Sequence, residues 1–430
     1  MRFLLPVIAL GWSAIAFAQQ SDRELLDYVV GLRVEHQSNI SLLPGDDIED
    51  LVISPFLDFD INRRGSQWQL EASGNLLYAT YLEDNFDSEY RGILNARFEY
   101  QILPDRLSWI VEDNLARAAI NTFSVQNPNN QQQTNTFSTG PDLSIRLNSR
   151  DSLVLGARIQ DFYSDRDDTD STSESVSAVL TRQSSASRSY FLNLSATSLD
   201  FDEASFGIDG FDQLDAAIGF LQAFTIGGAT HSVSLSGGYS ESDFNGQNGS
   251  IQSPVVQFDW QRTRNDGSSL GISVVQDIGN FAGSVSEINR FSPDNLSLLQ
   301  QSTTDPFERR QAGVNLTQRL GPRTGLNVNV LVEDREFSQG ILDEQSYSFN
   351  GGLDFQLTPL TSFTFNVNSR RREFDSGQDD TFHNVDFGVR MVRTRRWSYD
   401  LTFGYQKRSS SVADFDADNK SVALSINYVR

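Results

Sequence analysis

The chain has 430 residues, no cysteine and a formal net charge of -23. Without cysteine it can form no disulfide scaffold, thiolate metal site, c-type haem attachment or N-terminal lipoprotein anchor. Its acidity argues against nucleic acid as a partner, because a nucleic-acid binder needs a basic patch to replace counterions.

Residues 1–18 have the pattern of a secretory signal peptide. Arg2 forms a positive n-region, residues 3–10 an apolar core, and residues 16–18 (Ala-Phe-Ala) a small-x-small cleavage site. A short buried helix is the alternative interpretation, but it does not account for those flanks. We therefore expect the signal peptide to be removed and residues 19–430 to form one domain in a Gram-negative envelope.

From residue 26 onward, apolar side chains recur at every second position in segments of ten or more residues. Clear examples are Leu26, Tyr28, Val30, Leu32 and Val34, then Trp68, Leu70, Ala72, Gly74, Leu76 and Tyr78, and finally Val422, Leu424, Ile426 and Tyr428. Strict alternation predicts strands. Their length matches a tilted membrane strand and exceeds the usual five or six residues of a soluble sheet.

Short and long connections alternate between these segments. The short turns are 62–66, 103–106, 148–151, 183–188, 225–230, 262–269, 320–325, 357–362 and 393–396. The longer, mostly acidic loops are 41–50, 82–89, 118–136, 164–174, 199–210, 240–250, 279–306, 335–346, 372–381 and 409–420. This pattern is typical of periplasmic turns and extracellular loops. It predicts an all-β, transmembrane, antiparallel up-and-down β-barrel of about 20 strands (18–22), with both termini periplasmic.

Aromatic residues and charges support that orientation. Trp68, Trp109 and Trp397 closely follow short turns and Trp260 precedes one, each on the apolar side of its segment. Tryptophan favours the membrane–water boundary, so these four residues predict one interface belt. Arginines gather at the same turns, and tyrosines mark the opposite ends of the segments. A large soluble all-β protein would explain neither the strand lengths nor the two belts.

The other parity of each segment is polar and predicts the wall of a water-filled lumen. The predicted pore-lining charges are Arg33, Glu71, Arg91, Arg97, Glu99, Arg146, Arg158, Asp259, Asp354, Asp386 and Arg390. Loops 118–136 and 279–306 are long enough to fold inward and narrow the pore. Staying outside is an equally open alternative for both loops.

The sequence gives little support for a catalytic site or a metal-binding site. His36, His231 and His383 share the parity of the apolar stripes or lie at their ends, which places them away from the lumen and disfavours a Ser-His hydrolase. We expect no enzyme activity and no bound cofactor.

Near the C-terminus, Asp414, Asp416 and Asp418 resemble the start of a calcium loop. They lack its glycine at the sixth place and its glutamate at the twelfth, where Ser425 stands, so no dedicated metal site is predicted. Divalent cations are still expected to bridge the acidic loops to anionic lipopolysaccharide, which together with outer-membrane lipid is an expected partner.

Two resemblances add to this interpretation. The final strand resembles the C-terminal signal recognised by the barrel-assembly machinery, although it ends on Arg430 where an aromatic is usual. The mature length resembles the porin-like outer-membrane barrels found beside exopolysaccharide and PEP-CTERM export systems. That resemblance is carried by residues 107–113 (Leu-Ser-Trp-Ile-Val-Glu-Asp), the Asn-rich stretch 121–135, residues 140–142 (Gly-Pro-Asp) and the terminal Tyr-x-Arg. It implies a barrel tied to envelope or polysaccharide export and supplies no binding residues.

We therefore expect an outer-membrane channel that passes polar solutes or an exopolysaccharide chain by passive diffusion. The alternative is a non-conducting structural barrel whose acidic surface loops bind a partner or a polysaccharide.

Overall fold

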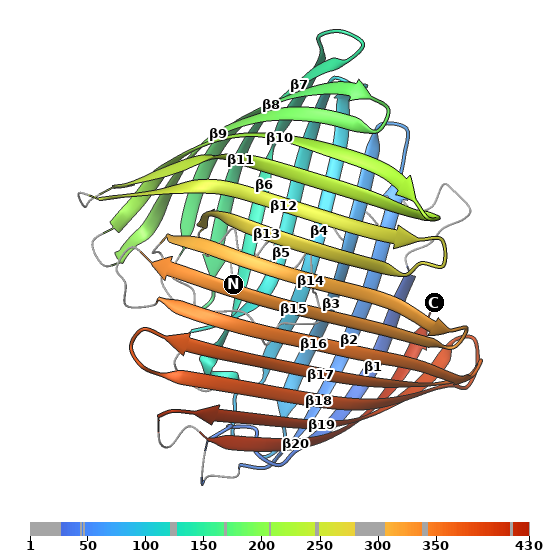
Figure 1. The fold of residues 1–430 in the computed structure, drawn as a ribbon. Helices are drawn as coiled ribbons and strands as arrows, with labels where there is room; N and C mark the ends of the chain where they lie inside the picture. Colours follow the sequence, from blue (N-terminus) through green and yellow to red (C-terminus); the bar gives the residue numbers. More distant parts are fainter. Residues whose placement is uncertain are drawn as a thin grey trace.

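Twenty antiparallel strands form a single closed barrel in the computed structural model (Figure 1). The structure describes residues 27–43, 45, 48–120, 127–166, 170–205, 208–245, 249–279, 306–337, 343–412 and 416–429. Each strand pairs with its neighbours in the chain, and the first strand also pairs with the last, from Val29 opposite Val429 to Gln37 opposite Ser421. This pairing closes the wall and confirms the predicted fold class and strand number.

The strands of the wall are β1 (Asp27–Gln37), β2 (Asp50–Arg64), β3 (Trp68–Tyr81), β4 (Glu89–Leu103), β5 (Leu107–Ala119), β6 (Gln131–Arg146), β7 (Asp151–Ser164), β8 (Ser171–Ser185), β9 (Arg188–Ser205), β10 (Ile208–Ile226), β11 (Ala229–Asn245), β12 (Ser250–Arg264), β13 (Ser269–Gly279), β14 (Phe307–Gly321), β15 (Thr324–Phe337), β16 (Glu344–Thr358), β17 (Thr361–Phe374), β18 (Asp379–Val392), β19 (Trp397–Ser410) and β20 (Ala417–Val429). A single 3-10 turn, η1 (Pro128–Asn130), precedes β6. No helix in this described part of the chain is long and apolar enough to cross a membrane.

The two ends of the barrel differ. All nine predicted short turns are confirmed, and they lie together at one end, which we call the turn rim. Both described ends of the chain, Asp27 and Val429, lie at this rim, whereas which side of a membrane it faces remains a prediction. The opposite end, the loop rim, carries the remaining connections.

Three of the predicted long loops are wrong. Strand β9 continues to Ser205 and β10 begins at Ile208, so most of 199–210 is strand. Loops 240–250 and 372–381 are shortened in the same way, because Asp243 pairs opposite Ser250 and Glu373 opposite Asp379. Backbone hydrogen bonds extend the ladder past the apolar stripe, and polar side chains do not interrupt them.

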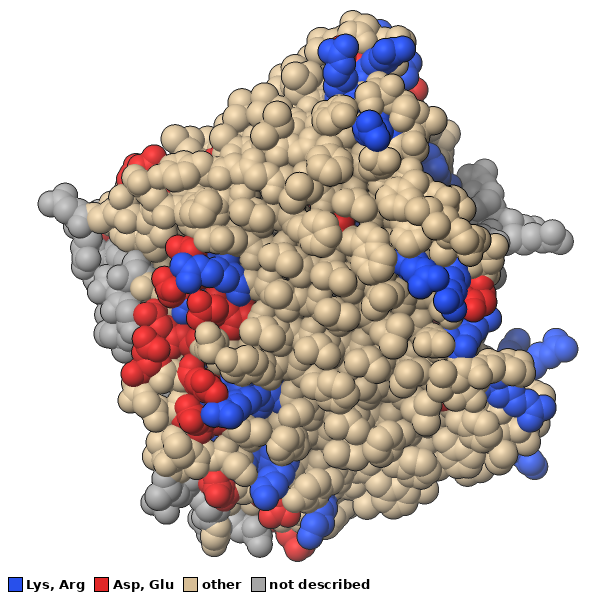
Figure 2. Space-filling view, viewed as in Figure 1, with Lys and Arg blue, Asp and Glu red and all other residues tan. Residues whose placement is uncertain are grey.

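The outer face of the wall is apolar. Val314 lies opposite Val330 and Phe387 lies opposite Phe403, and all four side chains are exposed. Figure 2 shows this surface as a broad band almost free of charged residues between two charged rims. Because successive strand residues point to opposite faces, the residues between these positions form the inner face of the barrel.

A pair of substitutions on adjacent residues tests this assignment of faces. Val314→Arg, in the middle of β14 on the outer face, is expected to lower the free energy of unfolding by about 2–4 kcal/mol in lipid, because it places a charge in hydrocarbon. The inner-face neighbour variant Asn315→Arg should change it by less than about 1 kcal/mol. Urea titration in lipid vesicles measures both. Equal costs for the two variants would contradict the assignment.

Candidate functional site

The inner face near the turn rim is polar and open to solvent. In β15, Asn327 and Asn329 on the inner face are exposed, and so is Val330 on the outer face. Strands about 4.8 Å apart and tilted by about 40° give a twenty-stranded barrel a backbone diameter of about 40 Å. Side chains alone cannot fill that width, so this half of the interior, which we call the turn half, is a wide polar vestibule.

Several of the predicted pore-lining charges are ion-paired on this face. Arg97 bonds Glu112 on the neighbouring strand and lies 3.8 Å from Glu99. Arg33 pairs with Glu35 at 2.9 Å. Glu112 was not among the predicted residues, although its parity relative to Trp109 already places it on the inner face. Only its contact with Arg97 depends on the register between β4 and β5.

Arg158 fills a break in the wall. The ladder between β6 and β7 is interrupted at Gly140 and Pro141, and Pro141 has no backbone N–H to donate. The Arg158 guanidinium donates to the carbonyl oxygens of Pro141 at 3.1 Å and Ala157 at 2.9 Å, and pairs with Asp142 at 2.8 Å. The predicted lining residue therefore also replaces backbone hydrogen bonds, a role that sequence reasoning missed.

A recurring arrangement orients three of the predicted pore-lining carboxylates. An amide two residues earlier on the same strand donates to the acid: Gln69 to Glu71 at 2.6 Å, Gln257 to Asp259 at 3.0 Å and Asn384 to Asp386 at 2.7 Å. Asn75 donates to Asp58 across the β2–β3 pair. These neutral donors orient the carboxylates and leave their charge in place.

Acids outnumber arginines in the turn half. We define the turn-half charges as the inner-face charged residues within seven positions of the strand ends at the turn rim. The acids are Asp27, Asp58, Asp60, Glu71, Glu99, Glu112, Asp142, Asp259, Asp354, Asp386 and Asp400. The arginines are Arg33, Arg64, Arg97, Arg146, Arg158, Arg319 and Arg390. Of the predicted lining residues in this set, Arg390 lies 3.8 Å from Asp400, and Arg146 and Asp354 are exposed.

The inner face of the loop half, between the vestibule and the loop rim, is buried. Its buried residues come from strands all around the wall and include Val52, Ala79, Tyr81, Ala116, Ala118, Thr134, Thr136, Ser240, Ser242, Ser253, Arg309, Arg335, Glu344, Arg370, Arg372, Asp380, Arg408 and Asn419. Since a twenty-stranded wall cannot bury its own inner face, other parts of the chain must enter the barrel here. The interior therefore narrows from the turn rim to the loop rim.

The connection between β1 and β2 is one segment that enters. Ile40 is 6% exposed and packs with Val52, Ala79 and Tyr81 on the inner face. The Asn39 N–H donates to the side chain of Asn419 at 3.0 Å, which ties the connection to β20. Sequence reasoning missed this segment, although Ile40, Leu42, Leu43 and Ile48 give it more apolar side chains than a solvated loop needs.

The connection between β5 and β6 meets the same segment. Only the two ends of the predicted loop 118–136 are strand; between them Pro128 and Asn130 are buried, and Asn127 donates to the carbonyl oxygen of Ser41 at 3.1 Å. These contacts favour inward folding for the described part of that loop. Of the predicted loop 279–306, residues 280–305 lie outside the described residues.

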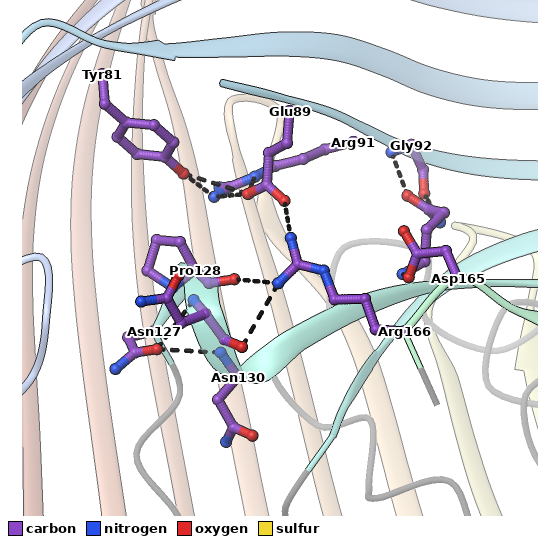
Figure 3. A network of polar contacts seen from close by, with 11 residues as sticks. Tyr81, Glu89, Arg91, Gly92, Asn127, Pro128, Asn130, Asp165 and Arg166 are labelled. Carbon is purple, nitrogen blue, oxygen red and sulfur yellow. Dashed lines mark hydrogen bonds and ion pairs between the residues drawn. The ribbon is translucent and has the colours of Figure 1, made fainter. Parts of the chain in front are cut away.

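A polar network links this connection to the wall (Figure 3). The predicted lining residue Arg91 donates to Glu89 at 2.7 Å and also bonds Tyr81. Arg166 reaches Glu89 at 3.3 Å and donates to the Pro128 carbonyl at 3.1 Å.

Asp165 lies in the connection that follows β7, outside the strands. Asp165 accepts the backbone N–H of Gln133 at 2.8 Å, and burial raises the pKa of the Asp165 carboxyl while that hydrogen bond lowers it.

Opposite this network lies a group that we call the arginine–acid cluster. It consists of Asp277, Arg309, Glu333, Arg335, Glu344, Arg370, Arg372, Asp380 and Arg408. Its contacts include Arg309–Asp277 at 2.7 Å, Arg372–Glu344 at 2.5 Å and Arg408–Asp380 at 2.8 Å. Guanidinium groups also lie over Phe307, Phe374 and Phe382. None of these charges was among the predicted lining residues. Arg335, Glu344, Arg372 and Asp380 lie in segments assigned to loops, and Arg309 and Arg370 stand beside arginines of opposite parity.

The four tryptophans lie on the outer face near the turn rim. Trp68 stacks on Phe98, Trp260 contacts His231, and Trp397 packs edge-on against Tyr428. Trp109 is 41% exposed and donates to the Thr139 hydroxyl at 2.8 Å. Tyr90, Tyr239, Tyr347 and Tyr405 are exposed toward the loop rim. The interface belt itself remains a prediction that this placement supports.

These features together decide the kind of protein. In hydrocarbon every backbone polar group must be bonded internally, and a closed barrel with an apolar exterior meets that requirement. An even strand number, an apolar band and aromatic girdles are properties of bacterial outer-membrane proteins. The chain is a bacterial outer-membrane β-barrel.

Comparison with known proteins gives no closer assignment. No protein-family model and no curated protein matches the sequence. Similar solved structures include the outer membrane protein OpdK from Pseudomonas aeruginosa, with 10% identity and a TM-score of 0.41 over 95% of this chain and 100% of that one. OccK2 (OpdF) from the same organism, in complex with glucuronate, has 12% identity and a TM-score of 0.42 over 95% and 100%. The FrpB iron transporter from Neisseria meningitidis has 10% identity and a TM-score of 0.47 over 97% and 83%. Similarity this low does not indicate which solutes the chain binds or transports.

One Ser–His pair exists among the described residues. The Ser369 hydroxyl lies 3.0 Å from His383 Nδ1, on the outer face. The residue opposite His383 on the next strand is Lys407, and a lysine cannot orient a catalytic imidazole as a carboxylate does. His36 and His231 also lie on the outer face, His231 stacked against Phe224. The geometry gives no support to a hydrolase.

The candidate calcium ligands are only partly described. Asp414 lies outside the described residues, and Asp416 accepts the backbone N–H of Ser410 at 2.7 Å. Asp418 lies on the outer face, opposite Lys407. Within the described ranges, no three histidine or acidic residues gather as metal ligands would.

Proposed function

We propose that the barrel is a passive diffusion channel for small polar solutes. The observation that carries the proposal is the polar, solvent-exposed inner wall of the turn half inside a wall that is closed and apolar outside. Barrels of this strand number leave an aqueous lumen unless something fills them. The loop half narrows that lumen, which suits small solutes better than large ones.

Single-channel recording tests the proposal. Purified barrel inserted into planar bilayers is expected to give discrete conductance steps in KCl. A correctly folded barrel that stays silent would contradict the channel and favour the non-conducting structural barrel. Folding is checked in the same sample by resistance to protease and by the shift in gel mobility on boiling.

Passage of an exopolysaccharide chain remains a prediction of the sequence resemblance. Inner-wall amides and arginines can form many weak hydrogen bonds with sugar hydroxyls, but a polymer would also have to pass the buried loop half. Polysaccharide added to one side should block the conductance transiently if the chain can enter. Bridging divalent cations and contact with the barrel-assembly machinery also remain predictions.

A further inference from the structure

We propose that the channel prefers cations to anions, an inference that rests on the proposed channel function and adds its ion preference. The turn-half charges contain more acids than arginines, and these acids come from β1–β6, β12, β16, β18 and β19. A ring of carboxylates favours cations, because each ion in the lumen feels the summed charge of the wall.

Four of the turn-half acids accept hydrogen bonds from neutral amide side chains. Asp58, Glu71, Asp259 and Asp386 each accept a hydrogen bond from an asparagine or glutamine side chain. An amide donor orients a carboxylate and stabilises its ionised form without adding a positive charge. The excess of negative charge at the level of these four residues therefore acts on the solution in the lumen.

The charges of the loop half do not reverse the sign of the net charge in the lumen. The arginine–acid cluster contains one more arginine than acids, but the same half also carries Glu35, Asp50 and Asp215 on the inner face. Glu89 and Arg91 offset each other there. Ions that cross the barrel therefore meet no compensating positive ring among the described residues.

The expected preference depends on salt. A net charge of about four at about 15 Å from the axis makes K+ about tenfold more permeant than Cl− at 0.01 M salt. The ratio falls to about twofold at 0.1 M and to about one at 1 M, where the screening length is about 3 Å. Reversal potentials across KCl gradients at these concentrations measure it directly.

The quadruple variant Asp58→Asn, Glu71→Gln, Asp259→Asn, Asp386→Asn should bring the ratio at 0.01 M down to about one, because the amides remove charge and keep shape. The matched control, Asp334→Asn, Glu336→Gln, Glu373→Gln, Asp379→Asn, removes as many charges from the outer face at the loop rim, where Arg310 and Arg371 bind them. This control should keep the preference of the parent chain.

If the barrels conduct but the permeability ratio of K+ to Cl− at 0.01 M is one or favours anions, the inference is overturned and the proposed channel function is retained. An unchanged ratio in the quadruple variant would also overturn it. Should that variant fail to fold, the salt dependence of the parent chain alone decides. Absence of any conductance from folded barrels would instead overturn the proposed function.

Discussion

Removing the carboxylate of Asp380 is expected to destabilise the barrel by about 3–5 kcal/mol, because it leaves a buried guanidinium without its ion-pair partner. Arg408 is 0% exposed and Asp380 is 3% exposed, and their atoms lie 2.8 Å apart. The variant Asp380→Leu keeps the number and branching of the side-chain heavy atoms and removes the charge. Urea unfolding in lipid vesicles, followed by tryptophan fluorescence, measures the loss.

Two further variants separate charge burial from packing. The double variant Asp380→Leu, Arg408→Met removes both charges and should recover most of the lost stability, since a buried ion pair can be replaced by apolar residues at little cost. Asp379→Asn disrupts the exposed pair with Arg371 and should cost less than about 1 kcal/mol. A double variant as unstable as the single one would show that the loss came from packing and not from an unpaired charge.

Ile40→Asp is expected to widen the loop half and to raise single-channel conductance severalfold. The Ile40 side chain holds the β1–β2 connection against Val52, Ala79 and Tyr81 inside the barrel. Burying that side chain contributes about 1.5–3 kcal/mol, whereas burying a carboxylate costs several kcal/mol, so the connection should leave the lumen. Conductance in 1 M KCl, where wall charges are screened, reports the change in width.

Leu82→Asp is the matched control for this variant. Leu82 lies just after β3 near the same rim, and its side chain is 48% exposed, so the same change of chemistry should leave the conductance unaltered. Non-electrolyte polymers of graded size add a second readout, because larger ones should enter from the loop rim only in Ile40→Asp. An unchanged conductance in a folded Ile40→Asp barrel would show that this connection does not narrow the path.

The sequence predicted the parts of the fold that repeat along each strand. Alternation of apolar and polar residues assigned the faces, and turn residues such as Gly227 and Gly228, which both have positive φ, marked the turn rim. Both signals are local, since each depends on residues within a few positions of one another. For that reason the strand number and all nine short turns could be predicted.

The contacts between strands could not be predicted in the same way. Which acid meets Arg97 or Arg158 depends on register, and a shift of one residue exchanges the two faces of a strand. In the run Arg370, Arg371, Arg372, composition suggests one basic patch, whereas alternation sends Arg371 outside and its neighbours into the arginine–acid cluster. The loop rim was least predictable, because polar side chains are compatible with both strands and loops.

The pairing of β1 with β20 has a consequence for how the wall is completed. The partner of β1 is β20, which is synthesised after the other nineteen described strands, so one edge of β1 keeps its N–H and C=O groups unbonded until β20 arrives. Such an open edge can add a strand from any neighbouring molecule. A chain that lacks β20 would therefore expose two unpaired strand edges, at β1 and at β19, and would aggregate instead of forming a closed barrel.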